Sequence, residues 1–279
     1  RELFRFGKWI FLSTAFTFLA MNLDKLILGK LLTLAELGVY SIALVFAAVA
    51  LEVASRLGNT VMFPVYAKFQ EQPAKLMEVA LRAREVVLWA GLAVCVAFSV
   101  GAPLFFETLW DQRYHEAGTI AQWLAAFIWT RILLSTMDRI PLAMGNSRVL
   151  FFSNVIQTGF VFVAIGGYLL AGLPGFIFGL VFGPLASHLF LLRYIPANKK
   201  KMLKQSIRFT LMVGLSSGLI VGLTLWVREN FNTPVWIFTV ITGAAIPVLI
   251  TAWIVYNRIW RNDSCRINVS KVAKGDGTS

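Results

Sequence analysis

The feature that most constrains this chain is a succession of apolar blocks, each long enough to cross a bilayer. A helix needs about 20 predominantly apolar residues to span the hydrocarbon core. Eight such blocks predict eight helices, over residues 8–32, 37–66, 86–109, 117–143, 149–170, 175–192, 209–227 and 235–256. The fold class that follows is all-α: a polytopic integral membrane helix bundle over residues 1–256. The polar residues 257–279 are predicted to form a disordered cytoplasmic tail.

Composition supports a membrane protein and argues against the other broad classes. Hydrophobic residues make up 58% of the chain and charged residues 14%, against roughly 45–50% and 25% in soluble domains. Such hydrophobicity excludes extended disorder, and two cysteines exclude a disulfide scaffold. We therefore expect one membrane unit and not two soluble domains.

The net charge of +12 would suggest nucleic acid as a partner if the cations shared one soluble face. They fall between the apolar blocks instead. With eight spans, twenty of the 26 basic residues lie in the segments on the side of both termini, and three lie in the connections on the other side. This bias predicts that both termini are cytoplasmic, and no nucleic-acid partner is expected. The run 199–201 is interpreted as a topology anchor near anionic lipid headgroups.

No arrangement of residues predicts an enzyme. The two histidines, His115 and His188, lie far apart in sequence and topology, and a metal site would need further ligands close to them. A glycine-rich phosphate loop followed by Lys-Ser or Lys-Thr is not present. We expect no catalytic residues, no metal and no cofactor.

Ionisable and polar side chains inside the spans are the strongest functional signal. Each charge costs roughly 2.5–3.5 kcal/mol on insertion scales, so it usually faces a cavity or a partner. The second and third of three clusters have i, i+4, i+7 spacing, which places their members on one helix face. The clusters are Asn22, Asp24 and Lys25; Glu52, Arg56 and Asn59; and Arg131, Ser135 and Asp138.

Two interpretations of these clusters remain open. They either pair internally or line a hydrated chamber. The internal pairs would be Glu52 with Arg56, Arg131 with Asp138 or Glu52, and Asp24 with Lys25 or a neighbouring helix. Snorkelling to the cytoplasmic interface is the preferred interpretation for Arg56, Asp138 and Arg139. For Arg131, Asp24 and Glu52 the chamber is preferred, and fixed cations in it would suit an anionic substrate.

Two further patterns concern packing. Glycines recur at every fourth position over 175–183 and again over 214–222, which permits close helix approach. From Pro73, charges at three- and four-residue spacing predict either a short surface helix or a solvated lead-in to the third span.

Several motifs of the chain resemble, in type and in order, those of the polysaccharide (oligosaccharide-lipid) flippases of the multidrug/oligosaccharidyl-lipid/polysaccharide exporter superfamily. They cover about the first two thirds of the chain, and their spacing and the topology match the second lobe of a 14-helix flippase. They are Phe6-Gly7, Asn22 to Gly29, Glu36 to Ser41, Met62 to Tyr66, Leu109 to Tyr114 with Ala117, and Leu142 to Arg148.

The resemblance implies a membrane transporter that moves an undecaprenyl-pyrophosphate-linked oligosaccharide from the cytoplasmic to the periplasmic leaflet of a bacterial inner membrane. Such transporters rock two lobes about a central cavity. By this resemblance, Arg131 and Lys25 would hold the diphosphate, and Asp24 and Glu52 would contact sugar or couple an ion. Implied partners are membrane lipids, an N-terminal lobe, and the glycosyltransferases or polymerase of the same pathway.

Other functions stay possible from sequence. A cation-coupled multidrug antiporter of the same superfamily would use a membrane carboxylate for coupling. A non-transporting scaffold would have no cavity, and its Asp24, Glu52 and Arg131 would all be paired. The chain opens with Arg1 and not Met, so we expect it to be a piece of a longer protein.

Overall fold

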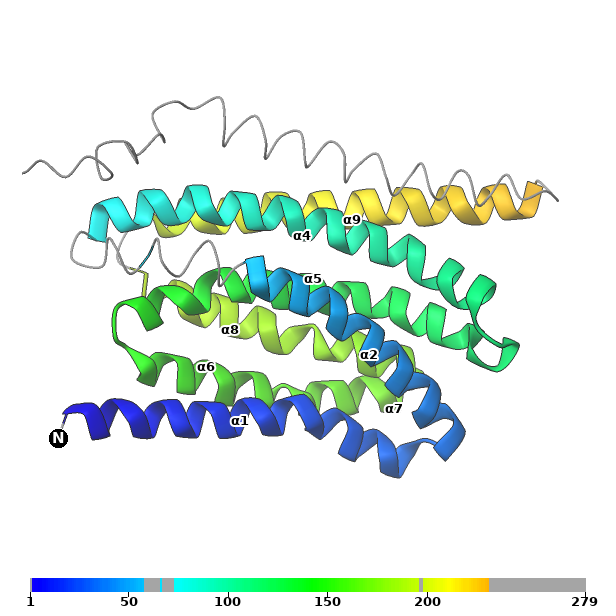
Figure 1. The fold of residues 1–279 in the computed structure, drawn as a ribbon, viewed down its shortest axis with the longest axis horizontal. Coiled ribbons are helices and arrows are strands. Elements are labelled where there is room, and N and C mark those ends of the chain that lie inside the picture. Colours follow the sequence, from blue (N-terminus) through cyan, green and yellow to red (C-terminus); the bar gives the residue numbers. More distant parts are fainter. Residues whose placement is uncertain (1, 58–65, 67–72, 196–197, 231–279) are drawn as a thin grey trace, which may run out of the picture.

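The computed structural model describes residues 2–57, 66, 73–195 and 198–230, and these ranges contain helices and no strand. Figure 1 shows the helices packed as a bundle, with the beginnings of α1, α4 and α9 at one end. The all-α fold is therefore confirmed. The elements are α1 (Glu2–Leu31), α2 (Leu34–Leu57), α4 (Pro73–Leu109), the 3₁₀ turn η2 (Gln112–Tyr114), α5 (His115–Ala143), α6 (Ser147–Gly159), α7 (Val161–Leu180), α8 (Phe182–Leu192) and α9 (Lys199–Asn230).

Within the described residues, four stretches are long and apolar enough to cross a membrane, as expected for a multi-pass membrane protein. They are Leu34–Glu52, Lys75–Leu109, Gln112–Leu142 and Ser147–Leu192. The last has 46 residues, about twice the length that one crossing needs. The count of eight spans stays a prediction, because the expected span 235–256 and the tail 257–279 lie outside the described residues.

The turn between α1 and α2 is fixed by a local capping box. The Thr33 backbone N–H and hydroxyl each donate to Glu36 Oε2 at 2.8 Å, and the Glu36 N–H donates to the Thr33 hydroxyl at 3.3 Å. A Thr-x-x-Glu pair satisfies backbone donors that would otherwise be unpaired at a helix start. The helix boundary is thus set by two residues of the sequence.

The segment that begins at Pro73 is the first part of α4 and not a separate surface helix. Its exposed Arg82 and Glu78 form an ion pair at 2.8 Å. The structure therefore supports the interpretation of this segment as a lead-in to the third predicted span.

The helix α5 is central, although its sequence is the least apolar of the predicted spans. It packs against α2, α4, α7 and α8, and its polar side chains are accommodated because protein surrounds the helix and not lipid. Close approach to α4 depends on Gly91, which lies against the Ile132 side chain, and on Gly118, which lies against Pro103.

A reversal inside α7 separates the predicted spans 149–170 and 175–192. Ala171 (φ −141°, ψ 18°) and Gly172 (φ 65°, ψ −147°) leave the helical conformation, and the positive φ at position 172 favours glycine. The two arms of α7, before and after this reversal, contact each other at Gly167 and Gly175. A methyl group on either glycine would overlap the carbonyl of the other. The first arm continues α6, and the second leads into α8.

The two glycine series behave differently. Gly179 faces the backbone of Ala164, and Gly183 faces Gln157, so the predicted close packing holds for residues 175–183. A methyl group added at Gly214, Gly218 or Gly222 on α9 would have no described atom within 4 Å. Spacing predicts that small residues share a face, but not whether another helix covers it.

Candidate functional site

A cavity of about 600 Å³ lies between α1, α2, α5, α6, α7 and α8. Six of the nine predicted site residues line it: Asn22, Asp24, Lys25, Arg131, Ser135 and Asp138. Arg139, Ser153, Asn154 and Gln157 are further polar residues of its wall. Apolar side chains of α2, such as Leu44 and Leu51, complete it. The structure thus joins two sequence clusters more than 100 residues apart in one chamber.

On α1, the Asp24 side chain is bound by a neighbouring helix and forms no ion pair with the ammonium group of the adjacent Lys25. Tyr40 of α2 donates a hydrogen bond from its hydroxyl to Asp24 Oδ2 at 3.1 Å, and Asp24 is 8% exposed. Its second oxygen, Oδ1, is buried with no hydrogen-bond partner in the described part of the chain. Within the described ranges the ammonium group of Lys25 forms no ion pair or hydrogen bond, so it is available to a ligand.

On α5, Arg131 faces α6. Its Nη1 donates to Gln157 Oε1 at 2.6 Å, and Gln157 Nε2 donates to Asn154 Oδ1 at 3.2 Å. Arg131 forms no ion pair with any described carboxylate, Asp138 and Glu52 included. The structure therefore does not show the alternative, internal pairing of Arg131, and Arg131 lines the cavity as preferred from the sequence. Its one side-chain hydrogen bond leaves other guanidinium N–H groups available.

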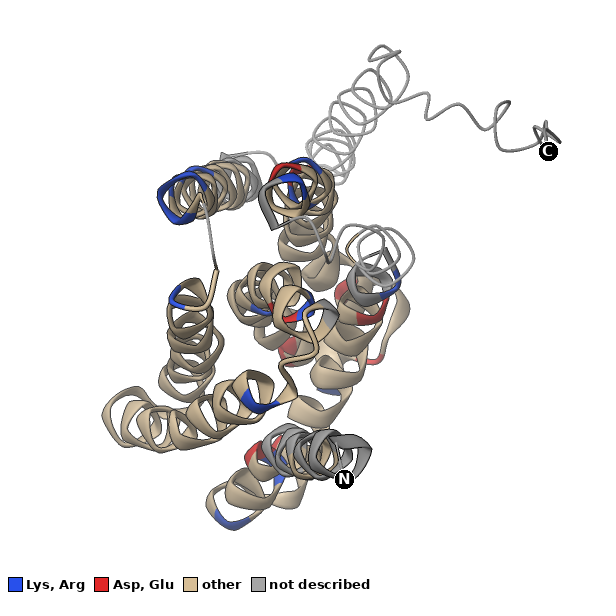
Figure 2. Ribbon diagram, turned by 90° about the vertical axis from the view of Figure 1, so that its left-hand side faces the viewer, with Lys and Arg blue, Asp and Glu red and all other residues tan. Residues whose placement is uncertain are grey.

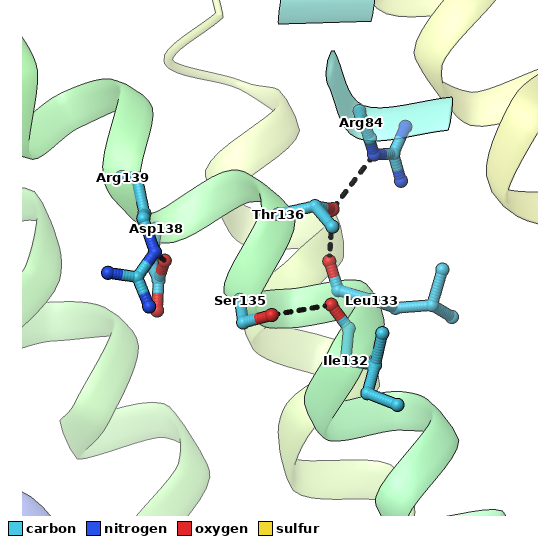
Figure 3. Close-up of polar contacts among 7 residues, drawn as sticks. All are labelled: Arg84, Ile132, Leu133, Ser135, Thr136, Asp138 and Arg139. Atoms are coloured by element: carbon cyan, nitrogen blue, oxygen red, sulfur yellow. Dashed lines mark hydrogen bonds and ion pairs between the residues drawn. The ribbon is translucent and has the colours of Figure 1, made fainter. Parts of the chain in front are cut away.

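Further along the same helix, Asp138 lies beside Arg139, with 3.9 Å between Asp138 Oδ1 and Arg139 Nε. Figure 3 shows this pair on one side of α5 and Thr136 on the other. Both Asp138 and Arg139 line the cavity, which favours the chamber over snorkelling for these two residues. Ser135, between Arg131 and Asp138, donates its hydroxyl to the Ile132 carbonyl at 2.8 Å.

The predicted cluster on α2 lies elsewhere. Glu52 and Arg56 form an i, i+4 ion pair at 2.8 Å, with side chains 61% and 79% exposed, and neither lines the cavity. Their internal pairing is thus confirmed, and a part in binding stays a prediction. Asn59 lies outside the described residues.

Arg84, one of the twenty basic residues predicted on the side of both termini, connects four helices through hydrogen bonds. Arg84 of α4 is fully buried, and it donates to Thr136 Oγ1 at 2.8 Å, Ser206 Oγ at 2.7 Å and the Met202 carbonyl at 2.9 Å. Ser206 in turn lies 3.0 Å from His188 Nε2 of α8. Figure 3 shows Arg84 reaching the face of α5 that is turned away from Asp138.

The neutral polar residues that α6 contributes to the cavity wall are likewise not among the site residues predicted from the sequence. Ser153, Asn154 and Gln157 carry no charge, so they cost less in an apolar span and gave a weaker signal than Arg131. Their spacing of one and three residues on α6 was the signal that could have found them, because it places them on one face.

The charges of the wall sum to a small positive excess. The cations are Lys25, Arg131 and Arg139, and the carboxylates are Asp24 and Asp138. The described residues contain no group of three or more His, Cys, Asp or Glu side chains that could hold a metal ion. The cavity therefore offers hydrogen-bond donors and cations to a ligand, inside a wall that is mainly apolar.

The structure is thus a multi-pass helix bundle with a polar cavity among its helices. Comparison with known proteins confirms the resemblance to the polysaccharide flippases. Residues 1–119 match the family described as "Polysaccharide biosynthesis protein". The chain is 24% identical over 135 residues to the amylovoran biosynthesis protein AmsL of Erwinia amylovora, covering 48% of this chain and 35% of AmsL. It is 25% identical over 178 residues to the lipopolysaccharide biosynthesis protein WzxC of Escherichia coli, covering 63% of this chain and 36% of WzxC.

Solved structures show the same fold. The lipid II flippase MurJ in an inward closed conformation matches with a TM-score of 0.63 at 15% identity, over 90% of this chain and 53% of MurJ. A multidrug resistance transporter of the MATE family matches with a TM-score of 0.54 at 18% identity, over 90% of this chain and 64% of that protein. The chain spans 35–40% of the length of the curated relatives it matches.

Proposed function

We propose that this chain forms one lobe of a flippase that translocates an undecaprenyl-pyrophosphate-linked oligosaccharide across a bacterial inner membrane. It corresponds to the second lobe of the 14-helix flippases, and both termini face the cytoplasm. The substrate would move from the cytoplasmic to the periplasmic leaflet, with its lipid tail in the bilayer. The activity is transport and not bond-making chemistry.

The observation that carries this proposal is the cavity with its excess of cations. A diphosphate needs cationic donors, and charge-assisted hydrogen bonds are about twice as strong as neutral ones. Lys25 on α1 and Arg131 on α5 supply such donors from two different helices of the wall. Asp24, Asn154 and Ser135 add groups that match sugar hydroxyls.

The two rival functions fit the cavity less well. A scaffold would pair its intramembrane charges, yet within the described part of the chain Arg131 and Lys25 form no ion pair. A cation-coupled drug antiporter would find carboxylates in Asp24 and Asp138, but the cations of the wall outnumber them. The similarity to the MATE transporter supports the shared fold and not its substrate.

The proposal is tested by neutralising Arg131 in the full-length protein. In cells that depend on this protein for surface polysaccharide, Arg131→Gln is expected to reduce export at least about ten-fold, because one charge-assisted hydrogen bond contributes about 1.5–3 kcal/mol. Arg131→Lys should retain part of the activity. The matched control is Arg82→Gln, which removes an exposed guanidinium on α4.

The readout is the amount of polysaccharide at the cell surface, together with the lipid-linked intermediate that accumulates at the cytoplasmic leaflet. Equal export by Arg131→Gln and Arg82→Gln, at equal protein levels in the membrane, would contradict the role of Arg131.

A further inference from the structure

The helix α9 carries cations at its beginning and, further along, the exposed apolar side chains of Leu211, Leu215 and Leu219. Lys200, Lys201 and Lys204 are exposed, and none forms an ion pair or hydrogen bond with another described residue. Figure 2 looks onto this end of the bundle, where Lys and Arg residues (blue) lie at the beginning of α9. In the sequence, the first acidic residue after Lys199 is Glu229. The beginning of α9 is therefore a concentrated positive surface without acidic neighbours on its own helix.

The cations and the apolar residues share one face. At 100° per residue, positions 200, 204, 211, 215 and 219 fall within about a quarter of the helix circumference. Leu211, Leu215 and Leu219 are 60%, 66% and 73% exposed. The face thus changes from positive to apolar along the helix axis. Between the two parts lies Arg208, which is paired with Glu85 of α4 at 3.1 Å.

The lengths match a helix that enters the bilayer from its headgroup layer. Phe209 to Trp226 is an apolar stretch that rises about 26 Å as a helix, close to the hydrocarbon thickness of about 30 Å. Lys204 lies five residues before this stretch, or about 7 Å, which is the depth of a headgroup layer. A lipid bound along this face would place its phosphate group at the lysines and an acyl chain along the leucines.

We propose that this face of α9 binds an anionic phospholipid of the cytoplasmic leaflet, with its phosphate at Lys200, Lys201 and Lys204 and an acyl chain along Leu211, Leu215 and Leu219. Zwitterionic lipids carry an ammonium group that the lysines repel, so the face selects acidic headgroups. The cytoplasmic leaflet is inferred from the excess of basic residues in the connections on that side.

The beginning of α9 is connected to a wall of the cavity by hydrogen bonds of Arg84. Arg84 binds Ser206 and the Met202 carbonyl on α9 and, on α5, Thr136. Thr136 belongs to the same turn as Ser135, which lines the cavity. The lipid-binding face and the cavity are therefore connected through one buried side chain, Arg84.

The test measures lipid retained by the full chain. Protein purified in mild detergent is incubated with phosphatidylglycerol or phosphatidylethanolamine, and bound lipid is counted by native mass spectrometry. The triple variant K200Q/K201Q/K204Q is expected to lose phosphatidylglycerol affinity about ten-fold or more, since each lysine near an anionic surface contributes about 1 kcal/mol. Binding of phosphatidylethanolamine should be weak in both proteins.

Two controls separate charge from fold. K200R/K201R/K204R keeps the charge and should retain phosphatidylglycerol, whereas Lys30→Gln removes an exposed cation from α1 and should change nothing. Unchanged thermal unfolding of the glutamine variant excludes loss of the bundle as the cause. Equal binding of the two lipids by the native protein, or unchanged phosphatidylglycerol affinity of the glutamine variant, would overturn the proposal. Neither result depends on export of oligosaccharide, so the proposed function is tested separately.

Discussion

Arg84 and Arg131 both place a guanidinium group inside the helix bundle, but their surroundings give them different roles. Arg84 is enclosed and donates to neutral acceptors on α5 and α9. Arg131 has one side-chain acceptor, Gln157, and borders an open cavity. A cation whose donors are satisfied by the protein stabilises the fold, and a cation with donors left over can bind a ligand. Sequence position alone does not separate these two cases.

Replacing Arg84 with Met is expected to destabilise the bundle by roughly 2–4 kcal/mol. The change removes several charge-assisted hydrogen bonds and leaves buried acceptors such as the Met202 carbonyl without their donor. Thermal unfolding in detergent measures the loss. The control Arg82→Met, which breaks an exposed ion pair, should cost about 1 kcal/mol or less, and equal costs for the two variants would show that Arg84 does not tie α9 to α5.

Gln157→Leu is expected to lower transport by roughly 5–30-fold, because Arg131 loses the acceptor that orients it. If Gln157 acts through Arg131, adding Gln157→Leu to Arg131→Gln should lower transport little further, and the coupling energy should be about 1–2 kcal/mol. Export of polysaccharide by the two single variants and the double variant gives this value. Fully additive losses would mean that Gln157 contacts the substrate independently.

At the scale of elements, the boundaries were predictable where local chemistry sets them. The Thr33–Glu36 capping box fixes the start of α2, and the glycine and proline of residues 172–174 separate two spans. Which face of each helix lines the cavity was harder to predict from the sequence. Glu52 and Arg56 have the same four-residue spacing as Arg131 and Ser135, but the first two pair with each other outside the cavity. Spacing defines a shared face, and only packing decides what that face meets.

The glycines give a prediction at this scale. Gly179→Val should destabilise the protein by about 1–3 kcal/mol, because its side chain would overlap the Ala164 backbone. Gly218→Val on α9, where no described atom lies within 4 Å, should have little effect. Thermal unfolding of the two variants, matched in residue type and in helical location, makes the comparison. A larger loss for Gly218→Val would show that another helix covers that face of α9.

At the scale of the whole molecule, the sequence predicted the all-α membrane bundle and the flippase resemblance, and the comparisons agree on both. Six of nine predicted site residues reach one cavity, because deeply placed charges in a membrane protein need polar surroundings. Arg84 and the amides of α6 were not predicted, because their roles come from contacts between helices distant in sequence. The fold therefore follows from hydropathy, whereas the site depends on tertiary packing.

The sidedness of the chain is testable at this scale as well. A single cysteine introduced at Lys200 should react with a membrane-impermeant maleimide only in inside-out vesicles, and one introduced at Gln112 only in right-side-out vesicles. Cys95 is buried, and Cys265 is replaced by serine in the test protein. The opposite labelling pattern would reverse the predicted orientation, and labelling of both positions from one side would contradict the number of intervening spans.

Photocrosslinking tests most directly whether the cavity holds the lipid-linked oligosaccharide. A photoreactive amino acid at Ser135, inside the cavity, is compared in the full-length protein with one at Phe162, which is 75% exposed on the outer face of α7. With a substrate carrying labelled sugar, we expect an adduct at position 135, its loss when Arg131 is also changed to Gln, and no adduct at position 162. Equal adducts at both positions, or an adduct at position 135 that survives Arg131→Gln, would contradict the assignment of this cavity as a diphosphate-binding site.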